Sequence, residues 1–180
     1  SMKFYSGKGD DGMSTFFGTP GRFSKTDARF EALGSVDELN TYLGICRSLT
    51  KDGEIQTVLK TVQENLFIIQ AEIGSPDKKA VSTITEEKVK ELEATIDSFG
   101  EIIGGMKPFR FTIAGGDTLA AHLDYARTIA RRAERSLAVI KHTLSQPAFS
   151  YINRVSSLLF VLARFINKKA GISEDNPTYK

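Results

Sequence analysis

Three charged side chains share one face of a segment with helical periodicity and could bind an anion. Arg127, Arg131 and Glu134 are spaced by four and three residues, which places them on one side of an α-helix. Arginine donates paired hydrogen bonds to phosphate oxygens, and a carboxylate among arginines can orient them or hold a ribose or a metal ion. A solvated face of salt bridges has the same pattern, so both interpretations stay open. Further cations that could neutralise a polyphosphate are Arg132, Arg135, Lys8 and Lys25.

The N-terminal stretch at residues 6–15, SGKGDDGMST, has the composition of a phosphate-binding loop. Its glycines let backbone N–H groups turn toward an anion, Lys8 adds positive charge, and Ser14 and Thr15 add hydroxyl donors. It is not a Walker loop, because the spacing to a Lys-Ser/Thr pair is absent. The alternative interpretation is a mobile polar tail.

Two further side chains have both a functional and an ordinary explanation. Asp37 falls in the first turn of a helix that we expect to begin at Ser35, where the helix dipole alone favours a carboxylate. Phe111 comes just before the helix that carries the arginines. An aromatic side chain there either fills the core or contacts a ligand.

The spacing of the residues does not support other common types of metal site or nucleophilic catalytic site. Di-iron helical bundles need Glu-x-x-His motifs, and neither His122 nor His142 follows a Glu at that spacing, so we interpret both as helix-surface residues. Cys46 lies in mid-helix without a base beside it, which predicts a buried thiol. No protein metal site is therefore expected.

The composition bounds the class of protein. The chain has 180 residues, 41% of them hydrophobic and 26% charged, and a formal net charge of +2, so a general nucleic-acid or membrane role is not expected. No apolar run approaches the ~20 residues of a membrane span. The single Cys46 excludes an intramolecular disulfide. Ser1 before Met2 is typical of a cloning remnant, and no signal peptide follows. We expect a cytoplasmic protein, or an organellar one if a targeting segment was removed.

The periodicity predicts an all-α fold, a five-helix antiparallel bundle in one domain over residues 1–180. A glycine-rich segment without helical period covers 1–34, and the bundle covers 35–171. The helices expected are 35–50, 54–73, 85–99, 118 onward after the capping Asp117, and 147–170. The fourth carries apolar residues at heptad spacing, and the fifth has a second, polar row. The heptad positions are Leu119, Leu123, Ala126, Ala130, Ala133, Leu137, Ile140 and Leu144, and the polar row is Asn153, Ser156, Ser157 and Arg164. Residues 109–113 alternate like an extended segment.

Four blocks of this sequence resemble the PduO-type ATP:cob(I)alamin adenosyltransferases. They are YSGKGDDGMST at 5–15, KTDARFEALGSVDELNTYLG at 25–44, FTIAGGDTLAAHLDYARTIARRAER at 111–135 and YINRVSSLLF at 151–160. The resemblance implies a homotrimer with active sites between subunits. It also implies transfer of the 5′-deoxyadenosyl group of ATP to the cobalt of cob(I)alamin, with release of triphosphate. Cobalt(I) would be the nucleophile, so no catalytic base would be needed.

The resemblance also implies roles for individual residues. Phe111 would press on the lower face of the corrin and favour four-coordinate cobalt(II), which can be reduced to cobalt(I). Asp37 would pair with Arg127 across the subunit boundary, and Mg²⁺ would lie between the phosphates of ATP. The residues expected to bind ATP are Ser6, Gly7, Lys8, Gly9, Ser14, Thr15, Lys25, Arg131, Arg132, Glu134, Arg135 and Asn153. Phe111 and Arg131 are the residues expected to act in transfer.

The sequence departs from the usual family pattern in four places. Ser6-Gly7 replaces a Thr-Lys pair with the lysine displaced to Lys8, Ala114 replaces a Pro, Asp124 a His, and Ser157 an Asp. The alternative function is a non-catalytic paralogue that binds ATP or adenosylcobalamin, and a third is a purely structural trimer. Expected partners are a reductase and an adenosylcobalamin-dependent enzyme.

Overall fold

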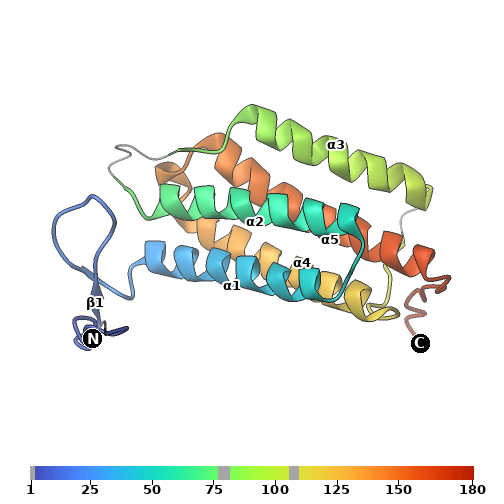
Figure 1. Cartoon of the computed structure of the whole chain (residues 1–180), viewed down its shortest axis with the longest axis horizontal. Coiled ribbons are helices and arrows are strands. Elements are labelled where there is room, and N and C mark those ends of the chain that lie inside the picture. Colours follow the sequence, from blue (N-terminus) through green and yellow to red (C-terminus); the bar gives the residue numbers. More distant parts are fainter. Residues whose placement is uncertain (1–2, 77–81, 106–109) are drawn as a thin grey trace.

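The computed structural model describes residues 3–76, 82–105 and 110–180 as a bundle of long helices with a small N-terminal hairpin (Figure 1). These residues form β1 (Met13–Ser14), β2 (Phe23–Ser24), α1 (Ala28–Ser48), α2 (Gly53–Ile73), α3 (Glu86–Ile103), α4 (Thr118–Val139), a 3₁₀ turn η1 (Lys141–Thr143) and α5 (Gln146–Lys169). α4 packs against α5 and α1, while α3 packs against α5, and α2 against α1. The predicted all-α bundle is confirmed.

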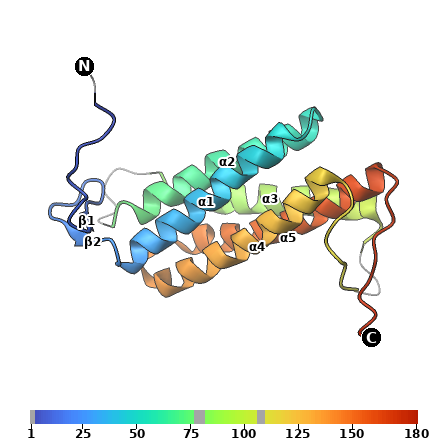
Figure 2. The ribbon, with the colours of Figure 1, turned by 90° about the horizontal axis from the view of Figure 1, so that it is seen from below.

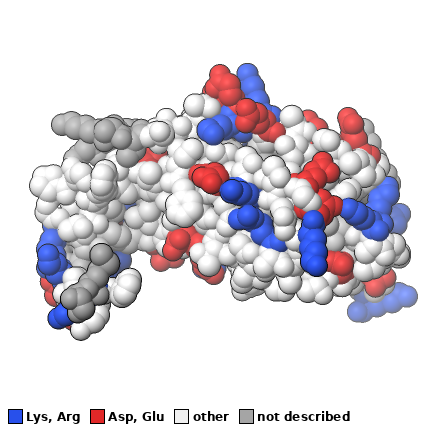
Figure 3. All heavy atoms as spheres, viewed as in Figure 1, with Lys and Arg blue, Asp and Glu red and all other residues white. Residues whose placement is uncertain are grey.

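The helices align along one axis, and the two chain ends lie at opposite ends of it (Figures 1 and 2). Most neighbouring helices are antiparallel, but α3 and α5 run in the same direction. Two contacts at successive levels show this: Glu93 accepts from Arg154, and the carbonyl of Ile102 accepts from Lys168. Positive and negative side chains are interspersed over the face seen in Figure 3, without a large area of one sign.

The first helix begins at Ala28, so the predicted start at Ser35 and the boundary between 1–34 and 35–171 are wrong. The Asp27 carboxylate caps the helix by accepting from the backbone N–H of Arg29 at 2.9 Å. The rings of Phe30 and Phe16 stack with centroids 4.3 Å apart, which ties the added turns to the N-terminal segment. Ser35 is instead buried inside the helix, within hydrogen-bonding distance of the Ser136 hydroxyl.

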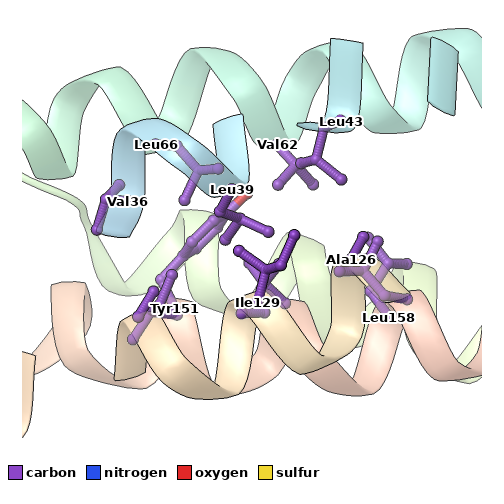
Figure 4. Close-up of a cluster of buried hydrophobic side chains, with 14 of the residues drawn as sticks. Val36, Leu39, Leu43, Val62, Leu66, Ala126, Ile129, Tyr151 and Leu158 are labelled. Carbon is purple, nitrogen blue, oxygen red and sulfur yellow. The ribbon is translucent and has the colours of Figure 1, made fainter. Parts of the chain in front are cut away.

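The apolar stripe of α4 is buried as predicted, including the two members that lie beyond the helix end, Ile140 and Leu144. It packs with the inward faces of the other helices in one continuous core. Figure 4 shows the middle of this core, with Leu39 of α1, Leu66 of α2, Ala126 of α4 and Leu158 of α5 pointing toward one another. Because the core is closely packed, α4 adopts one rotation about its own axis, and this rotation decides where its arginines point.

α5 packs against both α3 and α4. Among the described residues, it is the one helix that is long and apolar enough to cross a membrane by hydropathy. No apolar run of that length was expected from the sequence. Of its most apolar window, 56% is buried inside the protein, against α3 and α4. Its apolarity therefore has an explanation in the packing of the core.

The segment before α4 is not a strand. The described part, residues 110–113, has no regular structure, and the predicted Phe109 lies outside the described residues. The N–H of Ile113 donates to the carbonyl of Asp175 at 2.8 Å, so this segment lies against the C-terminal tail (Figure 2).

Candidate active site

A pocket of about 490 Å³ lies between α4, α5 and the segment that leads into α4. It brings together three of the predicted functional residues, which are Phe111, Arg127 and Arg131. Three of the four departures from the family pattern also line it, namely Ala114, Asp124 and Ser157. Phe160 and Val161 of α5 add apolar surface. The wall is therefore mixed, with aromatic and aliphatic surface beside three guanidinium groups, the third being that of Arg164, as large ligands with apolar and charged parts require.

Phe111 does not fill the core. Its side chain is 64% exposed at the edge of the pocket, and its carbonyl accepts a hydrogen bond from the Asn176 side chain at 2.7 Å. Of the two interpretations left open by the sequence, the structure excludes the core plug. An exposed aromatic ring beside a pocket is available to contact a flat ligand.

The two pocket arginines of α4 differ in their surroundings. The Nε of Arg127 is buried and has no hydrogen-bond acceptor among the described residues; the nearest carboxylate oxygen, Oδ1 of Asp124, is 4.0 Å away. Arg131, one turn later, is exposed and has no ion pair or hydrogen bond within the described part of the chain. A buried donor without an acceptor costs free energy. Both guanidinium groups are thus available to an acidic partner or ligand.

A buried ion network behind the pocket was missed by sequence reasoning. The Arg164 guanidinium, 8% exposed, lies between two carboxylates, with Nη2 2.5 Å from Asp124 Oδ2 and Nε 2.6 Å from Glu174 Oε2. Arg164 belongs to the polar row predicted on α5, which was the available signal. Asp124 lies two turns before Arg131 on α4, while Glu174 lies in the tail, where no periodicity exists to reveal it.

Glu134 of α4 and Asn153 of α5 contact each other. The Asn153 amide donates to Glu134 Oε1 at 2.8 Å, and its own oxygen accepts from Arg154 Nη1 at 2.7 Å. Arg154 in turn donates to Glu93 of α3 at 2.8 Å. Glu134 is therefore oriented by an amide and not by the neighbouring arginines. The roles of Glu134 and Asn153 in ATP binding stay predictions.

The arginine run of α4 is divided between two sides of the helix. Arg132 faces α1, where its Nη2 lies 2.6 Å from Glu38 Oε1, and this hydrogen bond raises the pKa of Arg132. Both side chains of this pair are about half exposed, so the interaction is weak. Arg135 is exposed, on the side of Arg131. ATP binding by Arg132 and Arg135 stays a prediction, and for Arg132 the salt-bridge interpretation also holds.

The N-terminal loop is folded back on itself. Lys25 donates to the carbonyl of Gly9 at 2.7 Å, and Arg22 holds both oxygens of Asp11, at 2.7 and 2.8 Å, which lowers the pKa of Asp11. Gly7 has φ +70°, a left-handed conformation suited to glycine, and its carbonyl accepts the turn hydrogen bond from Asp10. The loop that contains Ser6, Lys8, Ser14 and Thr15 is thus ordered by its own contacts, whereas Arg22 was not foreseen.

The loop and the pocket are far apart along the bundle within one chain. The loop lies beside the start of α1, and the segment with Phe111 enters at the opposite end (Figure 1). Among the described residues, no hydrogen bond or ion pair joins residues 6–15 to α4 or α5. The structure therefore does not bring the predicted phosphate loop to Phe111 in a single subunit.

The remaining candidates are structural. Cys46 is fully buried, and burial raises the pKa of its thiol to about 12, which confirms a buried thiol in place of a nucleophile. His122 is half-buried, with Nδ1 2.7 Å from the Tyr42 hydroxyl, so it packs between α1 and α4; His142 is exposed. The described residues contain no group of three or more His, Cys, Asp or Glu side chains that could hold a metal ion.

Comparison with known proteins identifies the family. The sequence model described as cobalamin adenosyltransferase matches residues 4–166. The chain belongs to the cobalamin adenosyltransferase family. It is 38% identical to a corrinoid adenosyltransferase of Citrobacter freundii over 167 residues, which are 90% of this chain and 93% of that one.

Solved structures of the cobalamin adenosyltransferase family agree with the fold. One is a phenylalanine-to-histidine variant of the PduO-type ATP:corrinoid adenosyltransferase from Lactobacillus reuteri, complexed with cobalamin and ATP; it has a TM-score of 0.89 and 29% identity over 98% of this chain and 97% of that one. An arginine-to-lysine variant from the same organism, complexed with ATP, has a TM-score of 0.86 and 29% identity over 99% and 100%. The prediction of an enzyme that transfers the adenosyl group of ATP to the cobalt of a corrinoid is confirmed.

Proposed function

We propose that this chain carries out adenosyl transfer in a site shared by two subunits of a homotrimer. One subunit contributes the pocket with Phe111, Arg127 and Arg131, and its neighbour contributes Asp37 and the N-terminal loop. The observation that carries this proposal is the buried Nε of Arg127, which has no acceptor among the described residues of its own chain.

The surface around Asp37 fits the other half of such a contact. Asp37 is exposed, and its hydrogen bond from Gln70 is long, at 3.4 Å. Gln70 borders a hollow of about 440 Å³ that also includes Phe17 and Phe67. These rings are 76% and 61% exposed, which is unusual for large aromatic side chains away from an interface. An exposed carboxylate beside apolar surface is complementary to a guanidinium on a second copy whose buried Nε has no acceptor among the described residues of its own chain.

The proposed chemistry needs positioning and charge stabilisation more than acid–base catalysis. The cobalt(I) of the corrin substrate donates an electron pair to C5′ of ATP as the C5′–O bond breaks; the cobalt becomes formally cobalt(III), and triphosphate leaves with the bonding pair. Arg131 would stabilise the charge that develops on triphosphate. Phe111 would contact the lower corrin face and hold cobalt(II) four-coordinate before its reduction. No base is needed in this scheme, because cobalt(I) is itself the nucleophile.

The residues present fit a magnesium ion held mainly by the substrate. Lys8, Lys25 and backbone N–H groups of residues 6–12 would hold the triphosphate together with its Mg²⁺. The ion would neutralise negative charge on the phosphates. We further propose a cytoplasmic location and a reductase partner that delivers the reduced corrinoid; the lone buried thiol of Cys46 supports a reducing compartment.

A corrin absorbance assay tests the activity. The protein is mixed with ATP, Mg²⁺ and chemically reduced cobalamin, and formation of the carbon–cobalt bond is followed by the spectral change. We expect turnover that depends on Mg²⁺. Binding of ATP without formation of the adenosylated corrin would reject the enzyme and support the non-catalytic paralogue.

Subunit complementation tests the shared site. Arg131→Ala removes the pocket half and Lys25→Ala the loop half, so each variant alone should lose activity with its trimer intact by sedimentation. If the two are unfolded and refolded together at equal amounts, about a quarter of the sites combine both intact halves. We expect about a quarter of wild-type activity from the mixture. Activity no higher than that of either variant alone, in verified mixed trimers, would place both halves in one subunit.

A further inference from the structure

The C-terminal tail lies directly against the segment that carries Phe111. The Asn176 amide donates to the Phe111 carbonyl at 2.7 Å, and the N–H of Ile113 donates to the Asp175 carbonyl at 2.8 Å. The two contacts flank Thr112, so they restrain the backbone directly after Phe111. Figure 2 shows the tail and the segment side by side at the end of the bundle.

The tail is anchored to the helices by a partly buried side chain of its own, Glu174, which is 20% exposed. Glu174 Oε2 accepts from Arg164 Nε at 2.6 Å and from Asn167 Nδ2 at 3.0 Å. Arg164 is 8% exposed, and its Nη2 donates to Asp124 Oδ2 on α4. Charge-assisted bonds in so enclosed a place are short and directional. Glu174 therefore fixes the register of the tail relative to α5.

The same anchor reaches the pocket. Asp124 lies between Arg164 and Arg127, with Arg127 Nε 4.0 Å from its other oxygen. Two guanidinium groups and two carboxylates thus form one network with no net charge, from Arg127 at the pocket to Glu174 in the tail. Asn167 extends it, because its amide also donates to the carbonyl of Gly115 just before α4.

We propose that residues 172–176 hold the Phe111 ring at the edge of the pocket, with Glu174 and Asn176 as positioning residues. This inference rests on the proposed role of Phe111 against the lower corrin face. The tail fixes the position of the backbone at Phe111. Weakening the contacts of the tail therefore lowers the fraction of cobalt(II) that is four-coordinate. Transfer that starts from cobalt(I) does not need this displacement and stays nearly unchanged.

The test compares two routes in the full-length chain. Electron paramagnetic resonance measures four-coordinate cobalt(II) in the complex with ATP, and the absorbance assay measures transfer from pre-reduced cobalamin. Asn176→Ala and Glu174→Gln should each lower the four-coordinate population about fivefold, the effect of one lost hydrogen bond. Transfer from cobalt(I) should change less than about twofold.

A matched control lies between the two residues. Asp175→Ala removes an exposed carboxylate but keeps the backbone carbonyl that accepts from Ile113, so both readouts should equal the wild type. If Asn176→Ala and Glu174→Gln also equal the wild type while Phe111→Ala loses the four-coordinate species, the proposal for the tail is overturned and the role of Phe111 stands. If Phe111→Ala has no effect either, the role of Phe111 fails as well. Equal losses in both routes would indicate a general folding role and would also contradict the proposal.

Discussion

Replacing Asp124 by alanine should destabilise the protein strongly, because it leaves a buried guanidinium with half of its partners. The Asp124 carboxylate is 4% exposed and contacts Arg164 at 2.5 Å, so water cannot readily replace it. Breaking a buried pair typically costs about 3–5 kcal/mol, but Arg164 keeps Glu174, which argues for the lower end, about 3 kcal/mol. Asp124→Asn keeps an acceptor of the same shape and should cost about half as much.

The assay is urea unfolding of both variants at one fixed protomer concentration, since an oligomer's stability depends on concentration. A second background, Arg164→Met, separates the ion pair from mere packing. With the buried charge removed, Asp124→Ala should cost less than about 1 kcal/mol. A cost for Asp124→Ala that is the same in both backgrounds, or below about 1 kcal/mol in the wild type, would refute the argument that Asp124 compensates a buried charge.

Three other outcomes follow from the site and the fold. Arg131→Ala should lower kcat/KM about 10²–10³-fold without a change in melting temperature, as for loss of one transition-state charge contact; near-normal rates would contradict its role. Phe111→Ala should spare ATP binding in calorimetry but impair transfer that begins at cobalt(II). Asp27→Ala should cost about 1 kcal/mol of stability at neutral pH as a lost helix cap. The hydrogen bonds from Arg29 lower the pKa of Asp27, so its contribution is present above the ordinary aspartate pKa and is lost as pH falls through the folded value. The difference in free energy of unfolding between the wild type and Asp27→Ala should therefore become smaller at acidic pH. A difference that is constant with pH would contradict this role of the Asp27 carboxylate.

Helix boundaries show where local signals suffice and where they mislead. The start of α5 near Pro147 followed from helix-forming rules, whereas the heptad spacing continues to Leu144, beyond the end of α4 at Val139. Ser35 was the expected start of the first helix yet lies inside α1, because Asp27 caps the helix and Phe16 stacks on Phe30. That stacking joins residues from two different segments, so no local window could weigh it.

The candidate site divides in the same way. The sequence alone determined that an arginine face lies beside the apolar stripe of α4, since both follow from a period of 3.6 residues. Only the tertiary structure decided which arginine faces which neighbour: Arg131 lines the pocket, while Arg132 turns to Glu38 of α1. The tertiary structure also exposed Phe111 and enclosed the network of Asp124, Arg164 and Glu174. The physical reason is that periodicity sets the relative angle of side chains on one helix, whereas burial and pairing depend on the elements packed against it.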